Sequence, residues 1–62
     1  MKTEPNIADP DAFYEAWTLA HEGLMDNESA DLDARLVLLL ANQVGDMEVL
    51  VECIAAARRA RR

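Results

Sequence analysis

Residues that can carry chemistry are few in this chain, and His21 is its only histidine. Trp17 precedes it by four residues and Tyr14 by seven, so the three side chains share one face if the segment is helical. An imidazole beside two aromatic rings would suit a small-molecule or metal-binding module. An aromatic stripe at helical spacing is more often part of a packed core, with the histidine resting on its aromatic neighbour at the boundary. We favour the second interpretation and keep the binding module as the alternative.

The acids Asp26, Glu28, Asp31 and Asp33 form a cluster of carboxylates. They lack the D-x-D-x-D-G spacing with a distal Glu that a calcium loop requires. A solvated first turn of a helix explains them better, because carboxylates favour the positive end of the helix dipole. One Cys and one His also fall short of the four ligands of a structural zinc site. We therefore predict no metal site and no cofactor.

The single cysteine, Cys53, lies in an apolar segment with no cation nearby until Arg58. Such surroundings do not activate a thiolate, so we expect a small side chain of the core. The chain also lacks a phosphate-binding loop, a dinucleotide fingerprint and a Ser/His/Asp set. We predict no catalytic residue and expect a protein that is not an enzyme.

The net charge of −6 is spread unevenly over the 62 residues. All twelve acids lie between Glu4 and Glu52, whereas four of the six basic residues are arginines within 58–62. An acidic body argues against nucleic acid as the main partner, because phosphate binding needs a basic surface. A nucleic-acid-binding regulator that uses the arginines is the second alternative to a protein-interaction module.

The apolar runs are short and the cysteine content is low. The longest run, Leu36 to Ala41, is far shorter than the roughly 20 residues that span a bilayer. A lone cysteine fits a reducing compartment. We expect a cytoplasmic protein with no membrane contact.

The chain divides into a flexible leader at 1–8, a single helical domain at 9–57 and an Arg-rich C-terminal tail at 58–62. Capping residues, Pro and Gly mark three helices, and no alternating strand pattern is present. The predicted boundary residues are, in chain order, Asp9 and Pro10, Leu24, Asp26 or Asn27, Val44, Gly45 and Asp46. The sequence thus predicts an all-α, three-helix antiparallel arrangement.

The second and third helices carry more apolar surface than so short a chain can cover. Folds of this size need dense helix packing or oligomerisation when disulfides and metals are absent. The run Leu36 to Leu40 is apolar around most of the helix, so it must be buried on more than one side. We therefore expect dimerisation to complete the fold, because large apolar patches mark association sites. The predicted interface residues are Val37, Leu38, Val44, Met47 and Val51.

Three segments, Asn6 to Asp11, Ala20 to Leu24 and Ala34 to Asp46, resemble a family of short bacterial proteins. The family is designated a domain of unknown function, with the serial two-seven-eight-three. The likeness covers nearly the whole chain up to Ala57 and transfers no catalytic residue, and Gln43 stands where relatives are expected to carry His. Members are expected to be encoded beside flavin-dependent aromatic hydroxylases of catabolic clusters. The resemblance therefore implies an accessory role to such an oxidoreductase, which would be a partner besides the second copy.

Overall fold

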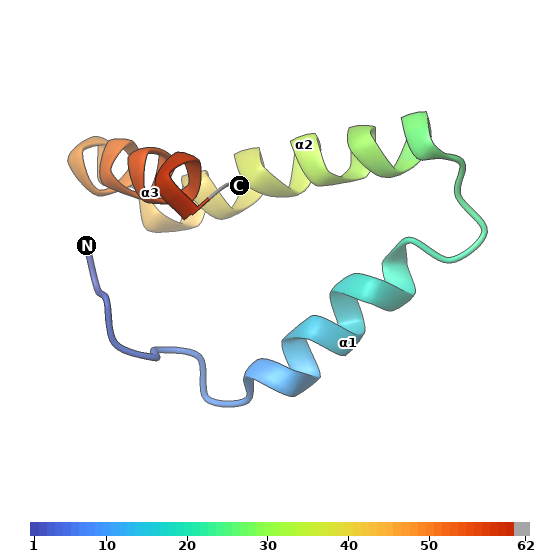
Figure 1. The fold of residues 1–62 in the computed structure, drawn as a ribbon, viewed down its shortest axis with the longest axis horizontal. Helices are drawn as coiled ribbons and strands as arrows, with labels where there is room; N and C mark the ends of the chain where they lie inside the picture. Colours follow the sequence, from blue (N-terminus) through green and yellow to red (C-terminus); the bar gives the residue numbers. More distant parts are fainter. Residues whose placement is uncertain (61–62) are drawn as a thin grey trace.

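The computed structural model describes residues 1–60 and contains three helices, which confirms the predicted all-α class (Figure 1). Helix α1 spans Pro10–Ala20, α2 spans Asp26–Val44 and α3 spans Met47–Ala60. The second connection includes Gly45, as the sequence predicts, and the first covers residues 21–25. Within this part of the chain no residue is in a strand.

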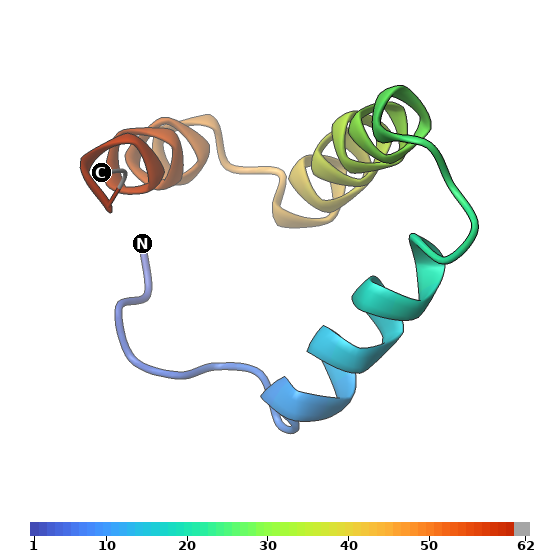
Figure 2. The same cartoon turned by 45° about the vertical axis from the view of Figure 1, so that its right-hand side comes forward.

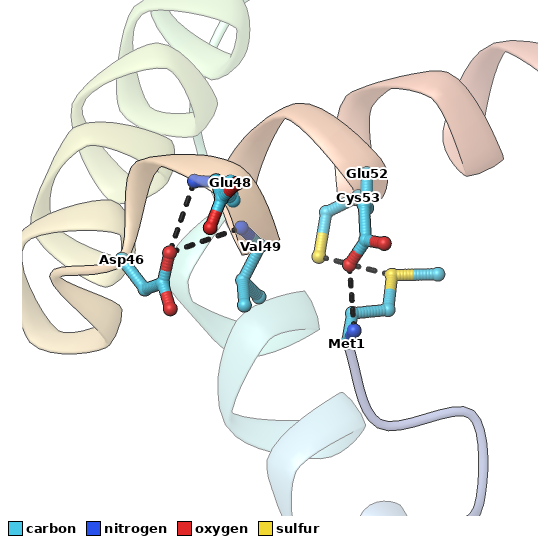
Figure 3. Close-up of polar contacts among 6 residues, drawn as sticks. All are labelled: Met1, Asp46, Glu48, Val49, Glu52 and Cys53. Carbon is cyan, nitrogen blue, oxygen red and sulfur yellow. Dashed lines mark hydrogen bonds and ion pairs between the residues drawn. The ribbon is translucent and has the colours of Figure 1, made fainter.

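Two of the predicted helix starts are confirmed by hydrogen bonds that the capping carboxylate accepts. Asp9 Oδ1 accepts from the backbone N–H of Ala12 at 3.0 Å, and Pro10 follows as the first helical residue. Asp46 Oδ1 accepts from the N–H groups of Glu48 and Val49 at 3.0 and 3.3 Å (Figure 3). In both cases a carboxylate satisfies backbone donors that the first turn leaves without a helical partner.

The predicted stop between α2 and α3 is also confirmed. Gly45 has a φ of 75° and donates its N–H to the carbonyl of Ala41 at 2.9 Å. This left-handed conformation suits glycine and ends the helix within one residue. Only Gly45 and Asp46 separate α2 from α3, so the connection is short.

The first connection differs from the prediction, because α1 ends at Ala20 and not near Leu24. His21 and Glu22 form a tight turn through N–H donation to the carbonyls of residues 18 and 19, and Gly23 then takes a φ of 76°. The cap of α2 is Met25, one residue before the predicted candidates. Glu28 explains this start, since its Oε1 accepts from the Met25 N–H at 2.9 Å.

The three helices follow an open curve (Figures 1 and 2). Among residues 1–60, backbone contacts between helices join α2 to α3 and do not join α1 to either. The leading segment, residues 1–9, runs from the start of α1 back towards α3, where the Met1 amino group donates to Glu52 Oε1 at 2.6 Å (Figure 3). The chain is therefore held in its curve by side-chain contacts and by short connections.

No residue of the described chain is fully buried. The chain exposes 5793 Å², whereas a compact monomer of 6.9 kDa would expose about 4,000 Å². The expectation that Cys53 is a core side chain is wrong: it is exposed, and its Sγ lies 3.4 Å from Met1 Sδ (Figure 3). The sequence predicts dense helix packing or oligomerisation as the support for so short a chain. Dense packing within one copy is absent from residues 1–60.

Candidate functional site

A cluster of three side chains joins α1 to α2 across the first connection. Trp17 lies in the last two turns of α1, His21 follows its last residue, and Asp33 lies in the third turn of α2. His21 Nε2 lies 2.7 Å from Asp33 Oδ1, and Trp17 Nε1 donates to the same oxygen at 3.1 Å. The early end of α1 makes this possible, because it places His21 in the turn that leads towards α2. We call these three residues the clasp.

The hydrogen bonds of the clasp favour the charged form of His21. Its Nδ1 lies 2.7 Å from the backbone carbonyl oxygen of Trp17, which can only accept. Its Nε2 faces the Asp33 carboxylate, which also accepts. Two acceptors facing the two ring nitrogens favour the imidazolium, in which both nitrogens donate.

The pKa values of the pair move in the directions that this arrangement requires. The Trp17 carbonyl, and then the Asp33 carboxylate, raise the pKa of His21 above its ordinary value of 6.5. The hydrogen bonds from His21 and then Trp17 lower the pKa of Asp33 below its ordinary value of 3.8. Each shift favours the charged form, and partial desolvation opposes both.

Aromatic contacts extend the clasp along α1. The rings of Trp17 and His21 meet edge to face at a centroid distance of 5.4 Å, as the sequence predicts for a histidine beside an aromatic neighbour. Tyr14 contacts Trp17 at 5.9 Å but forms no contact with His21 that would make a three-sided site. The predicted core role of this stripe is wrong within one chain, since Tyr14 is 63% exposed.

The geometry of the clasp suits a structural contact better than a ligand site. A hollow of about 300 Å³ lies beside Trp17, Thr18, His21 and Asp33. Both nitrogens of His21 are already engaged, so neither can act as a base or bind a metal without breaking the clasp. Within residues 1–60 no three His, Cys, Asp or Glu side chains gather as metal ligands would.

Sequence reasoning found His21 and Trp17 but missed the role of Asp33. It grouped Asp33 with the other acids of the first half of α2, which are exposed. Among the described residues only Glu28 of these others forms a side-chain hydrogen bond, which it accepts from the backbone N–H of Met25. The contact spans twelve residues across a turn, and no local spacing encodes it. The one available signal was the pairing of a lone histidine with an acid on the next helix.

The five predicted interface residues are all exposed, with Leu38 at 71% and Met47 at 70%. They are therefore available to a partner, and their role stays a prediction. Of the predicted Arg-rich tail, Arg58 and Arg59 lie in the last turn of α3, where cations complement the helix dipole. Arg61 and Arg62 lie outside the described residues.

A groove runs between α1 and α2 next to the clasp. Its volume is about 420 Å³. Apolar side chains from both helices form its walls, and one arginine borders it. The lining residues are Phe13, Ala16, Trp17, Ala20, Leu32, Arg35, Leu36 and Leu39.

None of the helices in the described part of the chain is both long and apolar enough to cross a membrane. No curated protein and no solved structure matches the sequence. The family described as "Protein of unknown function (DUF2783)" matches residues 1–59, two residues beyond the extent that the resemblance predicted. The chain therefore belongs to this family.

Proposed function

We propose that this protein is a non-catalytic helical interaction module that completes its fold by pairing with a second copy of itself. The observation that carries the proposal is the lack of any fully buried residue in 1–60, together with the long series of exposed large apolar side chains. Burial of apolar surface is the main force that stabilises a fold. A chain that buries so little alone needs a partner to supply the missing core.

The area is sufficient for a stable pair. The exposed 5793 Å² exceeds the surface of a compact monomer by about 1,800 Å², whereas a standard interface needs about 800 Å² from each partner. A dimer as compact as a monomer of twice the mass would bury roughly 5,000 Å² in total, which is typical of obligate dimers. Such partners fold together and have no stable folded monomer.

The predicted interface residues are exposed apolar side chains on both sides of the junction between two helices. Val37, Leu38 and Val44 come from α2, and Met47 and Val51 follow on α3. Residues 37–40 follow one another around α2, and all four are exposed. The second copy can therefore contact apolar side chains on several faces of this helix. Two-fold pairing needs only one such self-complementary surface.

The matched variants Leu38→Glu and Ala30→Glu test the proposal. Both positions are exposed on α2, but Ala30 lies outside the apolar run. Light scattering should give a dimer for the wild type and for Ala30→Glu, and a monomer for Leu38→Glu, because a buried carboxylate without a partner is costly. A dimer that persists in Leu38→Glu would show that Leu38 is not at the interface.

The accessory role implied by the resemblance is a second, heterologous interaction. Tyr14 and Leu19 on α1 remain exposed outside the predicted dimer surface and offer a place for it. The acidic body would steer the module towards a basic patch on an oxidoreductase. Pull-down from the native host at gentle salt, read by mass spectrometry, should recover such an enzyme; recovery of this chain alone would contradict the accessory role.

A further inference from the structure

We infer that the groove between α1 and α2 is the seat of α3 from the second copy, so that the dimer consists of two reciprocally completed three-helix bundles. This inference rests on the proposed function and specifies how the two chains interlock. It places Met47 and Val51, two of the predicted interface residues, in the partner's groove.

The groove has the lining of a helix seat. Phe13 and Leu36 face it from opposite helices, and Ala16 and Ala20 contribute small side chains to its α1 wall. Small residues let a third helix approach to the 8–10 Å that packed helices need. Within residues 1–60 no helix of the same chain occupies it, because α3 makes no backbone contact with α1.

Helix α3 presents the matching apolar stripe. Met47, Val51 and Ile54 follow one another at spacings of four and three, and they are 70%, 53% and 68% exposed. With 14 residues, α3 is about 21 Å long, against about 16 Å for the 11 residues of α1. Helix α3 is therefore longer than the α1 wall of the groove.

The basic C-terminal end of α3 is complementary in charge to the pair of helices that form the groove, although the first half of α3 carries Glu48 and Glu52. Residues 10–35, which form α1, the first connection and the first half of α2, hold seven acids against one arginine and the charged His21, a net charge of −5. Helix α3 ends in Arg58 and Arg59, and neither forms an ion pair with any other residue in 1–60. Seating α3 in the partner's groove brings these cations onto the acidic pair of helices, whereas the two acidic pairs would repel each other if they packed directly.

The short connection between α2 and α3 explains why the occupant comes from another copy. Gly45 ends α2 and Asp46 caps α3, so both connecting residues are committed to helix boundaries. They direct α3 away from its own α1 (Figure 2). A short hinge that prevents a helix from docking on its own chain favours exchange between identical chains.

Disulfide formation between two differently tagged chains tests the arrangement. One chain carries Val51→Cys and Cys53→Ser, so that its only thiol lies on the stripe of α3. The other carries Ala20→Cys and Cys53→Ser, with its only thiol in the groove. The matched control replaces Ala20→Cys with Asn27→Cys, an exposed position on α2 outside the groove.

The mixed disulfide should form at least about tenfold faster with Cys at position 20 than at position 27, since two cysteines join only when their Cα atoms lie within about 7 Å. Sedimentation of the same mixtures reports whether they are dimers. Dimers that cross-link no faster at position 20 than at position 27 would overturn the inference and leave the proposed function standing. Monomers of the wild-type chain would overturn the proposed function itself. If Ala20→Cys alone prevents pairing, Ala16→Cys in the same wall takes its place, and the same comparison decides.

Discussion

His21 Nε2 lies 2.7 Å from Asp33 Oδ1, and this contact spans the turn that joins α1 to α2. Because no backbone contact links α1 to α2 in residues 1–60, the angle between these helices depends on side chains. The clasp therefore positions the walls of the groove. The contact between His21 and Asp33 thus affects the shape of the groove between α1 and α2.

Removing the acid of the clasp should lower the pKa of His21. In Asp33→Asn the pKa should fall part of the way towards 6.5, because the Trp17 carbonyl, the larger cause of the upward shift, is still present. Proton NMR titration of the only imidazole in the chain measures this directly. Asp31→Asn, which removes an exposed carboxylate two residues away, should leave the pKa of His21 close to the wild-type value. An unchanged pKa in Asp33→Asn would show that the clasp does not form in solution.

Stability should depend on pH through the same pair. A raised histidine pKa stabilises the fold below 6.5, and this contribution is lost as the pH rises through the pKa of folded His21. A lowered Asp33 pKa stabilises the fold above 3.8, and this contribution is lost as the pH falls through the pKa of folded Asp33. The clasp is therefore fully effective between these two ordinary values.

The measurement is the thermal midpoint of unfolding across this range, at constant chain concentration, for the wild type and for His21→Gln. The Met1 amino group, whose pKa Glu52 raises, contributes equally to both proteins and cancels in the difference. The wild type should exceed His21→Gln most between pH 3.8 and 6.5 and lose that advantage at alkaline pH. A difference that does not vary with pH would contradict the charged pair.

The cap of α3 should also contribute measurable stability. Asp46→Ala removes the acceptor for two backbone N–H groups and should cost about 1 kcal/mol, as the loss of a helix cap does. Asp31→Ala, which removes an exposed acid inside α2, serves as the control for the loss of charge. Chemical denaturation at equal chain concentration compares them. Equal stability of the two variants would mean that the Asp46 cap is dispensable.

The sequence predicted what local chemistry determines. Asp9, Gly45 and Asp46 each act within four residues of their own positions, so their roles follow from residue type and spacing. The apolar stripe continues to Leu24 and so predicts a longer α1, whereas the helix gives way to a turn at His21 and Glu22 and Gly23 takes a φ of 76°. Cys53 was misassigned for a related reason: an apolar pattern shows which residues prefer burial but not whether the same chain can provide it.

The mass of the wild-type protein in solution tests the central claim most directly. Sedimentation equilibrium from low to high micromolar concentration should give twice the chain mass of 6.9 kDa, with a monomer appearing only on dilution and losing helical signal as it does. A stable, fully helical 6.9 kDa monomer at high micromolar concentration would contradict the claim that a second copy completes the fold.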